Sequence, residues 1–327
     1  MQTRRLGKSD LEVSAISLGC MGMTPFYGMP DDAESVATLR RAVEVGVTFF
    51  DTALYYGDGR NEEIVGSALN EFRCEITLAT KVGVYAKHGG GSGHRADPEY
   101  IKQCCDASLH RLKTDVIDLW YLHRVDPDTP VEDTVGAMGR CVDAGKVRAI
   151  GLCEVRPETL RQAHETYPIT ALQSEYSLWT RDPEGGALAI CRELGISFVP
   201  YSPLGRGFLT GTIGSQADLP DDDKRTIFPR FSNENLATNL TLLEVVRKIA
   251  ANKDCTPGQV ALAWVLAQGD NIVPIPGTRR PNYVEENAAA ASIVLEPSDL
   301  NLLNLAFPKD VAAGNRVPDG HLPYLNQ

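Results

Sequence analysis

The sequence has no hydrophobic run of membrane-spanning length and no excess of positive charge. No stretch of about 18 consecutive apolar residues occurs, and no apolar segment of signal-peptide type follows Met1–Gly7. Lysine and arginine number 32 against 43 aspartates and glutamates, which leaves a net charge of −11. Nucleic acids and anionic membranes need a basic surface, so we expect neither as a partner and expect a cytoplasmic protein. The oligomeric state stays open.

Metal-binding and dinucleotide fingerprints are also missing. None of the eight cysteines forms a C-x-x-C pair or lies at zinc-ligand spacing from the six histidines, so we expect no metal. The thiols instead fit a reducing compartment. No G-x-G-x-x-G follows an early strand, which argues against a doubly wound dinucleotide-binding sheet.

A regular alternation of apolar runs and amphipathic segments fills most of the chain. The apolar runs have strand length, and they are Ala15–Leu18, Thr48–Ala53, Ile76–Val82, Val116–Leu122, Val147–Leu152, Ala171–Tyr176, Ile196–Tyr201 and Ile272–Ile275. Helix starts are indicated by Asp97-Pro98, Thr129-Pro130 with Glu132, Asp182-Pro183 and Thr256-Pro257 with Gln259, and helix ends by Gly46, Gly145 and Gly195.

Eight strands that each lead into a helix predict an α/β fold of the (β/α)8 TIM-barrel type, because near-continuous apolar strands need cover on both faces. We expect residues 1–327 to form a single domain. Residues 2–13 are expected to form a β-hairpin that plugs the bottom of the barrel. Extra helices are expected from Pro281 and after Ser298, followed by an irregular tail, Phe307–Gln327, that either folds over the barrel mouth or stays disordered.

Two connections that follow predicted strands are too long to be turns. One is Gly83–Ala96, which contains the glycine-rich stretch 89–93, and the other is Pro203–Thr238, which contains four glycines near its start. In a barrel both rise over the C-terminal face, where active sites are built. We expect the second connection to be mobile until a cofactor orders it, since its glycines leave the backbone free.

Four polar residues fall at the ends of three successive predicted strands. Asp51 ends the second strand and Tyr56 follows it, Lys81 ends the third, and His123 ends the fourth. Taken one at a time, a buried ion pair, a surface tyrosine and a satisfied histidine explain them. Their shared place at the catalytic face of a barrel predicts an active site instead.

With these residues placed, the sequence resembles the aldo-keto reductase family, and within it the bacterial and plant branch of NADP-dependent aldehyde and ketone reductases. The resemblance rests on Asp51-Thr52-Ala53 with Tyr56-Gly57, Thr80-Lys81, Asp118-Leu119, His123-Arg124-Val125-Asp126, Gly145-Lys146-Val147-Arg148, Ile150-Gly151, Gln173-Ser174-Glu175-Tyr176, the stretch 201–207, the stretch 275–279, and Glu286-Asn287. These blocks and their spacing cover the chain from about residue 3 to residue 305.

The resemblance implies an enzyme that reduces aldehydes and ketones to alcohols by hydride transfer from NADPH. Tyr56 would be the general acid, and a phenol with an ordinary pKa of about 10 needs a nearby positive charge to donate well at neutral pH. Lys81 would supply that charge, with Asp51 holding it in place. His123 would orient the carbonyl and hydrogen-bond its oxygen.

The implied cofactor is NADP(H), bound in an extended pose. By resemblance, the carboxamide and nicotinamide would meet Gln173, Ser174, Tyr201 and Ser202, the pyrophosphate Leu204, Gly205 and Arg206, the 2′-phosphate Gly277, Thr278 and Arg279, and the adenine Glu286 and Asn287. The substrate is a small carbonyl compound, and Tyr27, Tyr85 and Trp179 are candidates for the walls around it.

Two residues depart from the family pattern. Cys153 stands where a serine or asparagine usually meets the carboxamide, and a thiol is a weak hydrogen-bond partner. Leu122 replaces a residue that is often polar in this branch, and we expect it to make the floor near His123 apolar.

Two other functions stay open at this point. The fold also serves as a non-enzymatic NADP(H)-binding subunit of potassium channels, which would show slow single turnover and tight retention of NADPH. In another class of barrel enzyme, Lys81 would form a Schiff base that borohydride traps on the chain. The natural substrate and the physiological direction of the reaction are not indicated by the sequence.

Overall fold

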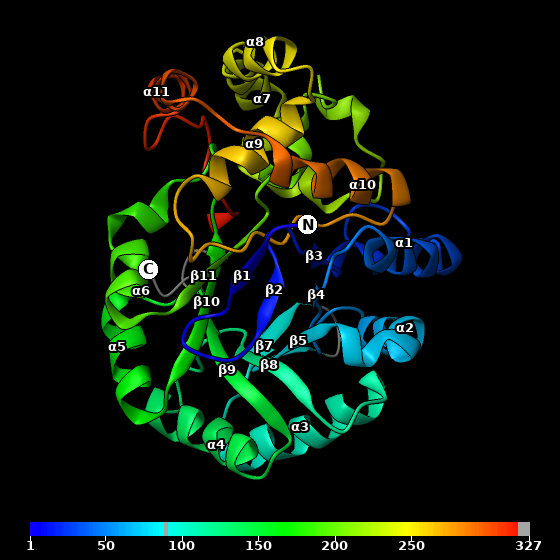
Figure 1. The fold of residues 1–327 in the computed structure, drawn as a ribbon, viewed down its shortest axis with the longest axis vertical. Coiled ribbons are helices and arrows are strands. Elements are labelled where there is room, and N and C mark those ends of the chain that lie inside the picture. The colour runs from blue at the N-terminus through cyan, green and yellow to red at the C-terminus, as the bar shows by residue number, and fades with distance from the viewer. Residues whose placement is uncertain (88–90, 320–327) are drawn as a thin grey trace.

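The computed structural model describes residues 1–87 and 91–319, and at its centre a parallel sheet curls into a barrel (Figure 1). Seven strands pair side by side in the order β11-β10-β9-β8-β5-β4-β3, all in parallel. They are β3 (Leu18–Gly19), β4 (Phe49–Asp51), β5 (Thr77–Val82), β8 (Ile117–Leu122), β9 (Val147–Cys153), β10 (Ile169–Glu175) and β11 (Ser197–Tyr201). The predicted runs lie at or beside these strands.

The predicted eighth strand, Ile272–Ile275, closes the ring through isolated bridges rather than a continuous ladder. Parallel bridges join this segment to β11 on one side, and Gly277 bridges Gly19 of β3 on the other. Pro274 and Pro276 explain the broken ladder, because proline has no N–H to donate. Their carbonyls instead accept hydrogen bonds of 3.1 and 3.2 Å from the chain at and just before β3. The predicted (β/α)8 TIM barrel is confirmed.

Helices surround this barrel on its outside (Figure 1). The ring consists of α1 (Asp32–Glu44), α2 (Arg60–Leu69), α3 (Pro98–Leu112), α4 (Val131–Asp143), α5 (Pro157–Thr166), α6 (Ala187–Leu194), α9 (Pro257–Leu266) and α10 (Pro281–Ala289). A further group at the top of the view contains α7 (Asn233–Leu240), α8 (Leu243–Asn252) and α11 (Pro297–Ala306). Within residues 1–87 and 91–319, no helix is long and apolar enough to cross a membrane.

Two of the four predicted helix starts carry the expected caps. Asp97 accepts a hydrogen bond from the third residue of α3, and Thr256 forms a capping box with Gln259 at α9. The predicted capping box at Thr129 is wrong, because its hydroxyl donates to Asp126 at 2.9 Å and α4 begins after Pro130 without a side-chain cap. Asp182 opens a short 3-10 turn, η3 (Asp182–Gly185), ahead of α6.

The predicted hairpin at the N-terminus plugs the barrel. Strands β1 (Thr3–Arg5) and β2 (Glu12–Ser14) pair antiparallel. Leu6 and Leu11, in the turn between them, are buried in one cluster with Phe49 and Leu119, which face the barrel interior. These apolar side chains fill the end of the barrel opposite the carboxyl ends of the strands.

The direction of side chains along β8 follows the strand period of two. Leu119 and Tyr121 belong to the interior cluster, whereas Trp120 and Leu122 pack in the larger cluster between strands and helices. The expectation that Leu122 forms an apolar floor beside His123 is therefore wrong. Leu122 faces outward, and His123 continues the inward series.

Both long connections contain more structure than the sequence indicates. In Gly83–Ala96, strands β6 (Val84–Ala86) and β7 (Ser92–His94) form a small hairpin. Residues 89 and 90 of the glycine-rich stretch lie outside the described residues. In Pro203–Thr238, four 3-10 turns, η4 (Gly205–Thr210), η5 (Gln216–Asp218), η6 (Lys224–Ile227) and η7 (Pro229–Phe231), precede α7. Helix α7 begins at Asn233, inside the predicted connection, because Ser232 caps it.

Candidate active site

The carboxyl ends of β4, β5 and β8 bring four predicted residues together at the mouth of the barrel. Lys81 forms an ion pair with Asp51 and a hydrogen bond of 3.2 Å with the hydroxyl of Tyr56. A further hydrogen bond of 2.7 Å runs from Lys81 to the carbonyl of Thr52. The imidazole of His123 stands edge-on to the Tyr56 ring, with centroids 5.8 Å apart. Lys81 thus links the carboxylate to the phenol.

The Lys81–Asp51 pair is buried and held from a third strand. Burial opposes the charge of Lys81, but Asp51 and Tyr56 outweigh it, so the pKa of Lys81 is raised and its ammonium persists. Gln173, on β10, donates to the second oxygen of Asp51 at 2.9 Å. The resemblance assigns Gln173 to the cofactor carboxamide, whereas the structure engages its amide nitrogen with Asp51. Its side chain therefore orients the acid of the pair.

The two aromatic groups of the site are both neutral. Burial raises the pKa of Tyr56, and the positive charge of Lys81 offsets only part of this shift because Asp51 opposes it. The direction is opposite to the lowered pKa expected from the sequence. Burial, followed by the charges of Arg124 and Lys81, holds the pKa of His123 well below its ordinary value. Tyr56 can therefore donate a proton, and His123 is an uncharged imidazole.

The end of β9 presents Cys153, which departs from the family pattern, and Glu154 directly after it. Burial raises the pKa of Cys153 to about 12, so its thiol stays protonated. Glu154 has a left-handed backbone with φ of 52°, and its buried carboxylate accepts a hydrogen bond of 2.9 Å from the backbone of Glu175. A carboxylate therefore stands next to the thiol, and its charge needs a partner.

That partner comes from the C-terminal tail. Arg316 donates to Glu154 at 3.1 Å, and the tail is held nearby by two hydrogen bonds between Ala313 and Asn239 of α7. Of the two expectations for the tail, folding over the mouth holds for residues 307–319, whereas 320–327 lie outside the described residues. The sequence carries no local signal for Arg316, because its partner lies 162 positions away.

Residues of the predicted pyrophosphate cradle follow β11. Gly205 has φ of 57°, and a Cβ there would lie 2.9 Å from the ring of Trp179, so both backbone and packing require glycine. The guanidinium of Arg206 donates to the buried Glu175 at 3.0 Å and lies over the ring of Phe228. Arg206 already has a carboxylate partner. To contact a pyrophosphate, its guanidinium would have to leave Glu175.

Ser174, Tyr201, Ser202 and Leu204 lie around the same strand ends. Ser174 is buried on β10 beside Gln173, and Tyr201 is partly exposed at the end of β11. Ser202 has φ of 49°, and the hydrogen bond from Gly205 to its carbonyl turns the chain there. Tyr201 thus has a ring at the mouth on which a flat ligand can stack.

A place suited to a phosphate lies at the start of α10. The helix has nine residues and no side-chain cap. Pro281 has no N–H and Tyr283 donates its own to the carbonyl of Arg280, so the N–H of Asn282 is the one without a partner among the described residues. Arg279, just before it, donates to the carbonyl of Gly28 at 3.2 Å and pairs with no carboxylate of the described residues. Thr278 accepts from the backbone of Arg280 at 3.1 Å, and Gly277 is exposed. These groups fit the 2′-phosphate of a dinucleotide.

The two residues assigned to the adenine are less open. Glu286 accepts a hydrogen bond of 2.7 Å from Thr256, the cap of α9, and its carbonyl accepts from Gln259. Asn287 is buried on α10. Glu286 therefore links α9 to α10. Glu286 and Asn287 both lie on α10, the helix whose start forms the candidate phosphate site.

The three candidate substrate walls have different surroundings. Tyr27 lies partly exposed under Arg225, whose guanidinium carbon is 5.0 Å from the ring centroid. Tyr85, on β6, packs over Gly93 of the same small hairpin. Trp179 is only 4% exposed and stacks on Phe208 with centroids 3.9 Å apart. Trp179 therefore belongs to the packing beneath the mouth, and the structure does not present it as an open wall.

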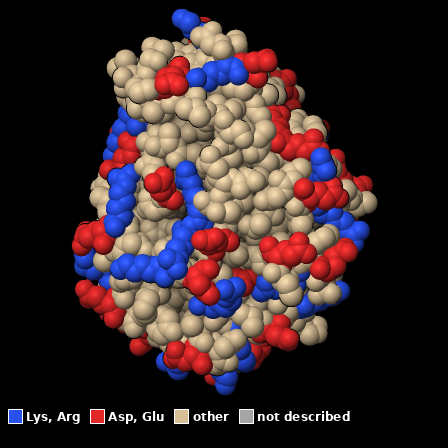
Figure 2. Space-filling model, viewed as in Figure 1, with Lys and Arg blue, Asp and Glu red and all other residues tan. Residues whose placement is uncertain are grey.

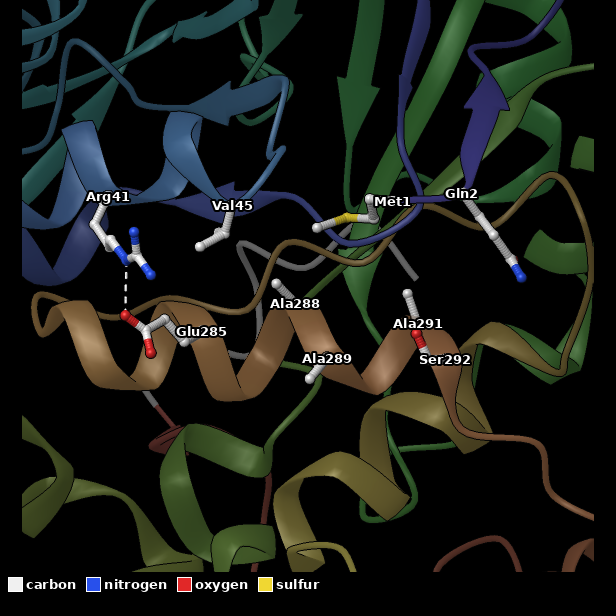
Figure 3. Close-up of a pocket in the computed structure, with 9 residues that line it drawn as sticks. All are labelled: Met1, Gln2, Arg41, Val45, Glu285, Ala288, Ala289, Ala291 and Ser292. Carbon is white, nitrogen blue, oxygen red and sulfur yellow. Dashed lines mark hydrogen bonds and ion pairs between the residues drawn. The ribbon is translucent and has the colours of Figure 1, made fainter.

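A hollow of about 350 Å³ lies away from these residues (Figure 3). It separates α1 from α10, and its lining includes Met1, Val45 and Ala288. Its charged groups, Arg41 and Glu285, neutralise each other across 2.7 Å. The hollow has no acid–base group left over for catalysis, so it is not the candidate active site.

The surface seen in the same view as the ribbon has charges of both signs interspersed around a broad uncharged area (Figure 2). No basic patch dominates this face. Among residues 1–87 and 91–319, no group of three or more histidine, cysteine, aspartate or glutamate side chains is placed to hold a metal ion.

Fold and site together define a barrel enzyme of the aldo/keto reductase type, and comparison with known proteins agrees. The family model for the aldo/keto reductase family matches residues 15–306. The chain therefore belongs to this family, whose members reduce small carbonyl compounds with a nicotinamide cofactor.

Individual proteins that the chain resembles are oxidoreductases of the same family. A probable aldo-keto reductase 1 from Glycine max is 43% identical over 322 residues, covering 98% of this chain and 93% of its own. The solved glycerol dehydrogenase AKR11B4 of Gluconobacter oxydans superposes with a TM-score of 0.86 at 27% identity, covering 93% of this chain and 94% of its own. The aldo-keto reductase AKR11C1 of Bacillus halodurans, solved in its holo form, gives 0.77 at 29% identity, covering 94% and 96%.

Proposed function

We propose that this protein is an NADPH-dependent reductase that converts aldehydes and ketones to alcohols, with Tyr56 as general acid assisted by Lys81, Asp51 and His123. The observation that carries the proposal is the position of Lys81, whose ammonium contacts both Asp51 and the hydroxyl of Tyr56. A buried cation that bridges an acid and a phenol at the mouth of a barrel has a direct use in proton transfer to a carbonyl oxygen.

When bound, the reduced nicotinamide supplies a hydride to the carbonyl carbon, and the chain does the rest. Tyr56 holds the proton that the carbonyl oxygen takes up, because its pKa is raised and the phenol stays protonated. Lys81 then stabilises the phenolate left behind, since its ammonium lies 3.2 Å from that oxygen. His123, as a neutral imidazole next to Tyr56, hydrogen-bonds and orients the carbonyl.

The choice of NADP(H) rests on the start of α10. Arg279, without a carboxylate partner among the described residues, stands beside the unpartnered N–H of Asn282 at the start of α10 in a chain of net charge −11. An acidic chain repels phosphate in general, so a local cation and a helix N-terminus are needed to hold one. A 2′-phosphate, which distinguishes NADPH from NADH, fits this place.

The structure favours neither rival function. A Schiff-base lysine needs a free amine, whereas Asp51 keeps Lys81 protonated. A cofactor-binding module without catalysis has no need for the contact between Lys81 and Tyr56. The eight cysteines are free thiols, which supports a reducing compartment such as the cytoplasm.

The proposal is tested with Tyr56→Phe and Lys81→Met. Tyr56→Phe should lower turnover of a simple aldehyde by about 10² to 10⁴, the usual worth of general acid catalysis, while NADPH binding persists. Lys81→Met should do similar harm, and the double variant should be little worse than either, because the two residues act as one unit. Turnover close to that of the unchanged enzyme in Tyr56→Phe would remove this tyrosine from the mechanism.

A further inference from the structure

Several cations surround the mouth of the barrel, and most of them face a carboxylate. The cations are Lys81, Arg124, Arg206, Arg230 and Arg316, and the carboxylates are Asp51, Glu154 and Glu175. Each carboxylate has its own cation: Lys81 for Asp51, Arg206 for Glu175 and Arg316 for Glu154. Two arginines, Arg124 and Arg230, are left without a carboxylate within ion-pair distance in the described part of the chain.

The guanidinium of Arg230 is hydrogen-bonded to other parts of the chain. It donates to the carbonyl of Trp179 at 2.8 Å and to the hydroxyl of Thr180 at 2.7 Å, and it approaches the carbonyl of Gly314 in the tail. These contacts join the loop after β10 to the tail. Arg230 therefore has a structural task and few donors to offer a ligand.

Arg124 has no such task. Its one hydrogen bond to a described residue, 2.5 Å long, goes to the carbonyl of His123, its neighbour in the chain. A guanidinium has five N–H donors in a planar fork, so most of those of Arg124 have no partner within residues 1–87 and 91–319. The side chain is half-buried, and none of its nitrogens is both fully buried and without a partner.

The place of Arg124 is next to the reacting groups. It follows His123 directly, and the titratable groups near it are Tyr201, Glu154, Cys153 and Tyr56, of which Glu154 is charged at neutral pH. Burial opposes its charge, but these neighbours outweigh burial and the pKa of Arg124 is raised. A permanent cation with unfilled donors thus lies beside His123, near the other groups of the proposed active site.

We propose that Arg124 recognises substrate, and that the enzyme prefers carbonyl compounds with a carboxylate close to the reacting carbonyl. This inference rests on the proposed function of the same site. Arginine matches the two oxygens of a carboxylate through its planar fork, and such charge-assisted pairs are the strong ones. Arg206 is less suited to this task because it lies with Gly205 along the proposed pyrophosphate cradle and is paired with Glu175.

A second role for Arg124 would produce a different pattern. If its charge only stabilised the oxygen that develops at Tyr56, every substrate would depend on it equally. If it binds a carboxylate, only anionic substrates depend on it, and the effect appears in KM. Pairs of substrates that differ in one charge separate the two roles.

The experiment compares the unchanged enzyme, Arg124→Gln and the control Arg140→Gln, which changes an exposed arginine on α4 away from the mouth. The substrate pairs are phenylglyoxylate with its methyl ester, and 4-carboxybenzaldehyde with benzaldehyde. We expect Arg124→Gln to lower kcat/KM for the anionic member of at least the first pair by about ten- to hundredfold, mainly through KM, and to change the neutral member less than about threefold. Arg140→Gln should change neither.

A second measurement uses only the unchanged enzyme, so it tests the inference even if Arg124→Gln does not fold. With the unchanged enzyme, rising salt should raise KM for phenylglyoxylate and leave that for its ester unchanged, because salt screens a charge pair. An equal fall for both members in Arg124→Gln, or KM values that ignore salt, would overturn the inference and leave the proposed function standing. No reduction of any of the four carbonyl compounds by the unchanged enzyme would instead overturn the proposed function.

Discussion

Lys81 and Asp51 act in opposite directions on the pKa of Tyr56, the proposed general acid. The ammonium of Lys81 favours the phenolate of Tyr56, whereas Asp51, which keeps the ammonium charged, disfavours that phenolate. Burial then decides the outcome, and the pKa of Tyr56 is raised. At the level of single residues, the site is therefore built to keep the proton on Tyr56 until a carbonyl oxygen takes it.

This balance gives a pH dependence with a definite sign. Reduction uses the protonated phenol, which persists below the folded pKa of Tyr56, so reduction should hold its rate up to about pH 10, the ordinary phenol value. Oxidation of an alcohol uses the phenolate, so its rate should rise with pH throughout that range. Initial rates in both directions from about pH 6 to 10 check this, with buffers of constant ionic strength. An oxidation rate that levels off near neutral pH would mean that Tyr56 titrates much lower.

Arg279 is expected to carry much of the preference for NADPH. Replacing it with alanine should weaken NADPH binding by about ten- to hundredfold, the worth of a charge-assisted bond, and leave NADH nearly unchanged. Arg280→Ala is the matched control, because Arg280 is exposed and lies over the ring of Tyr283 instead. Titration of both cofactors by fluorescence measures this. Equal losses for NADPH and NADH would assign Arg279 to the fold, where it holds the carbonyl of Gly28.

Among the elements, the connection after β11 is the one most closely tied to ligand binding. Its segment 205–231, here called the strap, crosses to the loop before α1. Lys224 donates its backbone N–H to Phe26, and Asp223 bridges Tyr27 while its carboxylate holds Arg225 at 2.6 Å. The strap is docked by these polar contacts and by apolar side chains such as Phe208 and Phe231, which are buried in the main hydrophobic cluster.

The strap should respond to cofactor. We expect NADPH to slow amide hydrogen exchange in residues 205–231, because a pyrophosphate would add contacts to the cradle at Leu204 and Gly205. Asp223→Ala should speed this exchange without cofactor, since it removes the carboxylate that holds Arg225 over the ring of Tyr27. Helix α4 serves as the internal control. Exchange in the strap that is the same with and without NADPH would contradict its role in holding the cofactor.

For the whole molecule, the two ends of the barrel have separate tasks. The carboxyl ends of the strands hold the charged site, and the opposite end is closed by apolar side chains of the hairpin such as Leu6 and Leu11. Arg4 reinforces this closure by donating to carbonyls of Leu266 and Gly269 at 3.1 and 2.8 Å. Stability and chemistry are therefore expected to respond to different substitutions.

Leu6→Ala tests this separation. Leu6 is fully buried, so its truncation should lower the free energy of unfolding by about 2–5 kcal/mol. The reduction rate of the folded enzyme should not change, because the tetrad lies at the other end of the barrel. Leu305→Ala is the control, since the same truncation at a side chain that is 79% exposed should cost little. Denaturant unfolding measures the stability, and steady-state rates measure the activity. A large loss of activity in folded Leu6→Ala would contradict the separation of stability and chemistry between the two ends of the barrel.

The sequence by itself determined the barrel, its hairpin plug and the meeting of Asp51, Tyr56, Lys81 and His123. Local patterns suffice for these, because apolar runs of strand length set the strands, and the barrel brings all their carboxyl ends to one face. The same logic places residues at a strand end without saying which way each side chain turns. The single-domain division of residues 1–327 stays a prediction.

The tertiary structure alone decided the partners of the side chains. Arg206 meets Glu175, Gln173 meets Asp51, and Arg316 reaches Glu154 across 162 positions. Such pairs depend on which elements pack together and on where a buried charge finds its opposite, and neither is written in a local pattern. For the same reason the sequence indicated a lowered pKa for Tyr56, whereas burial and the neighbouring carboxylate raise it.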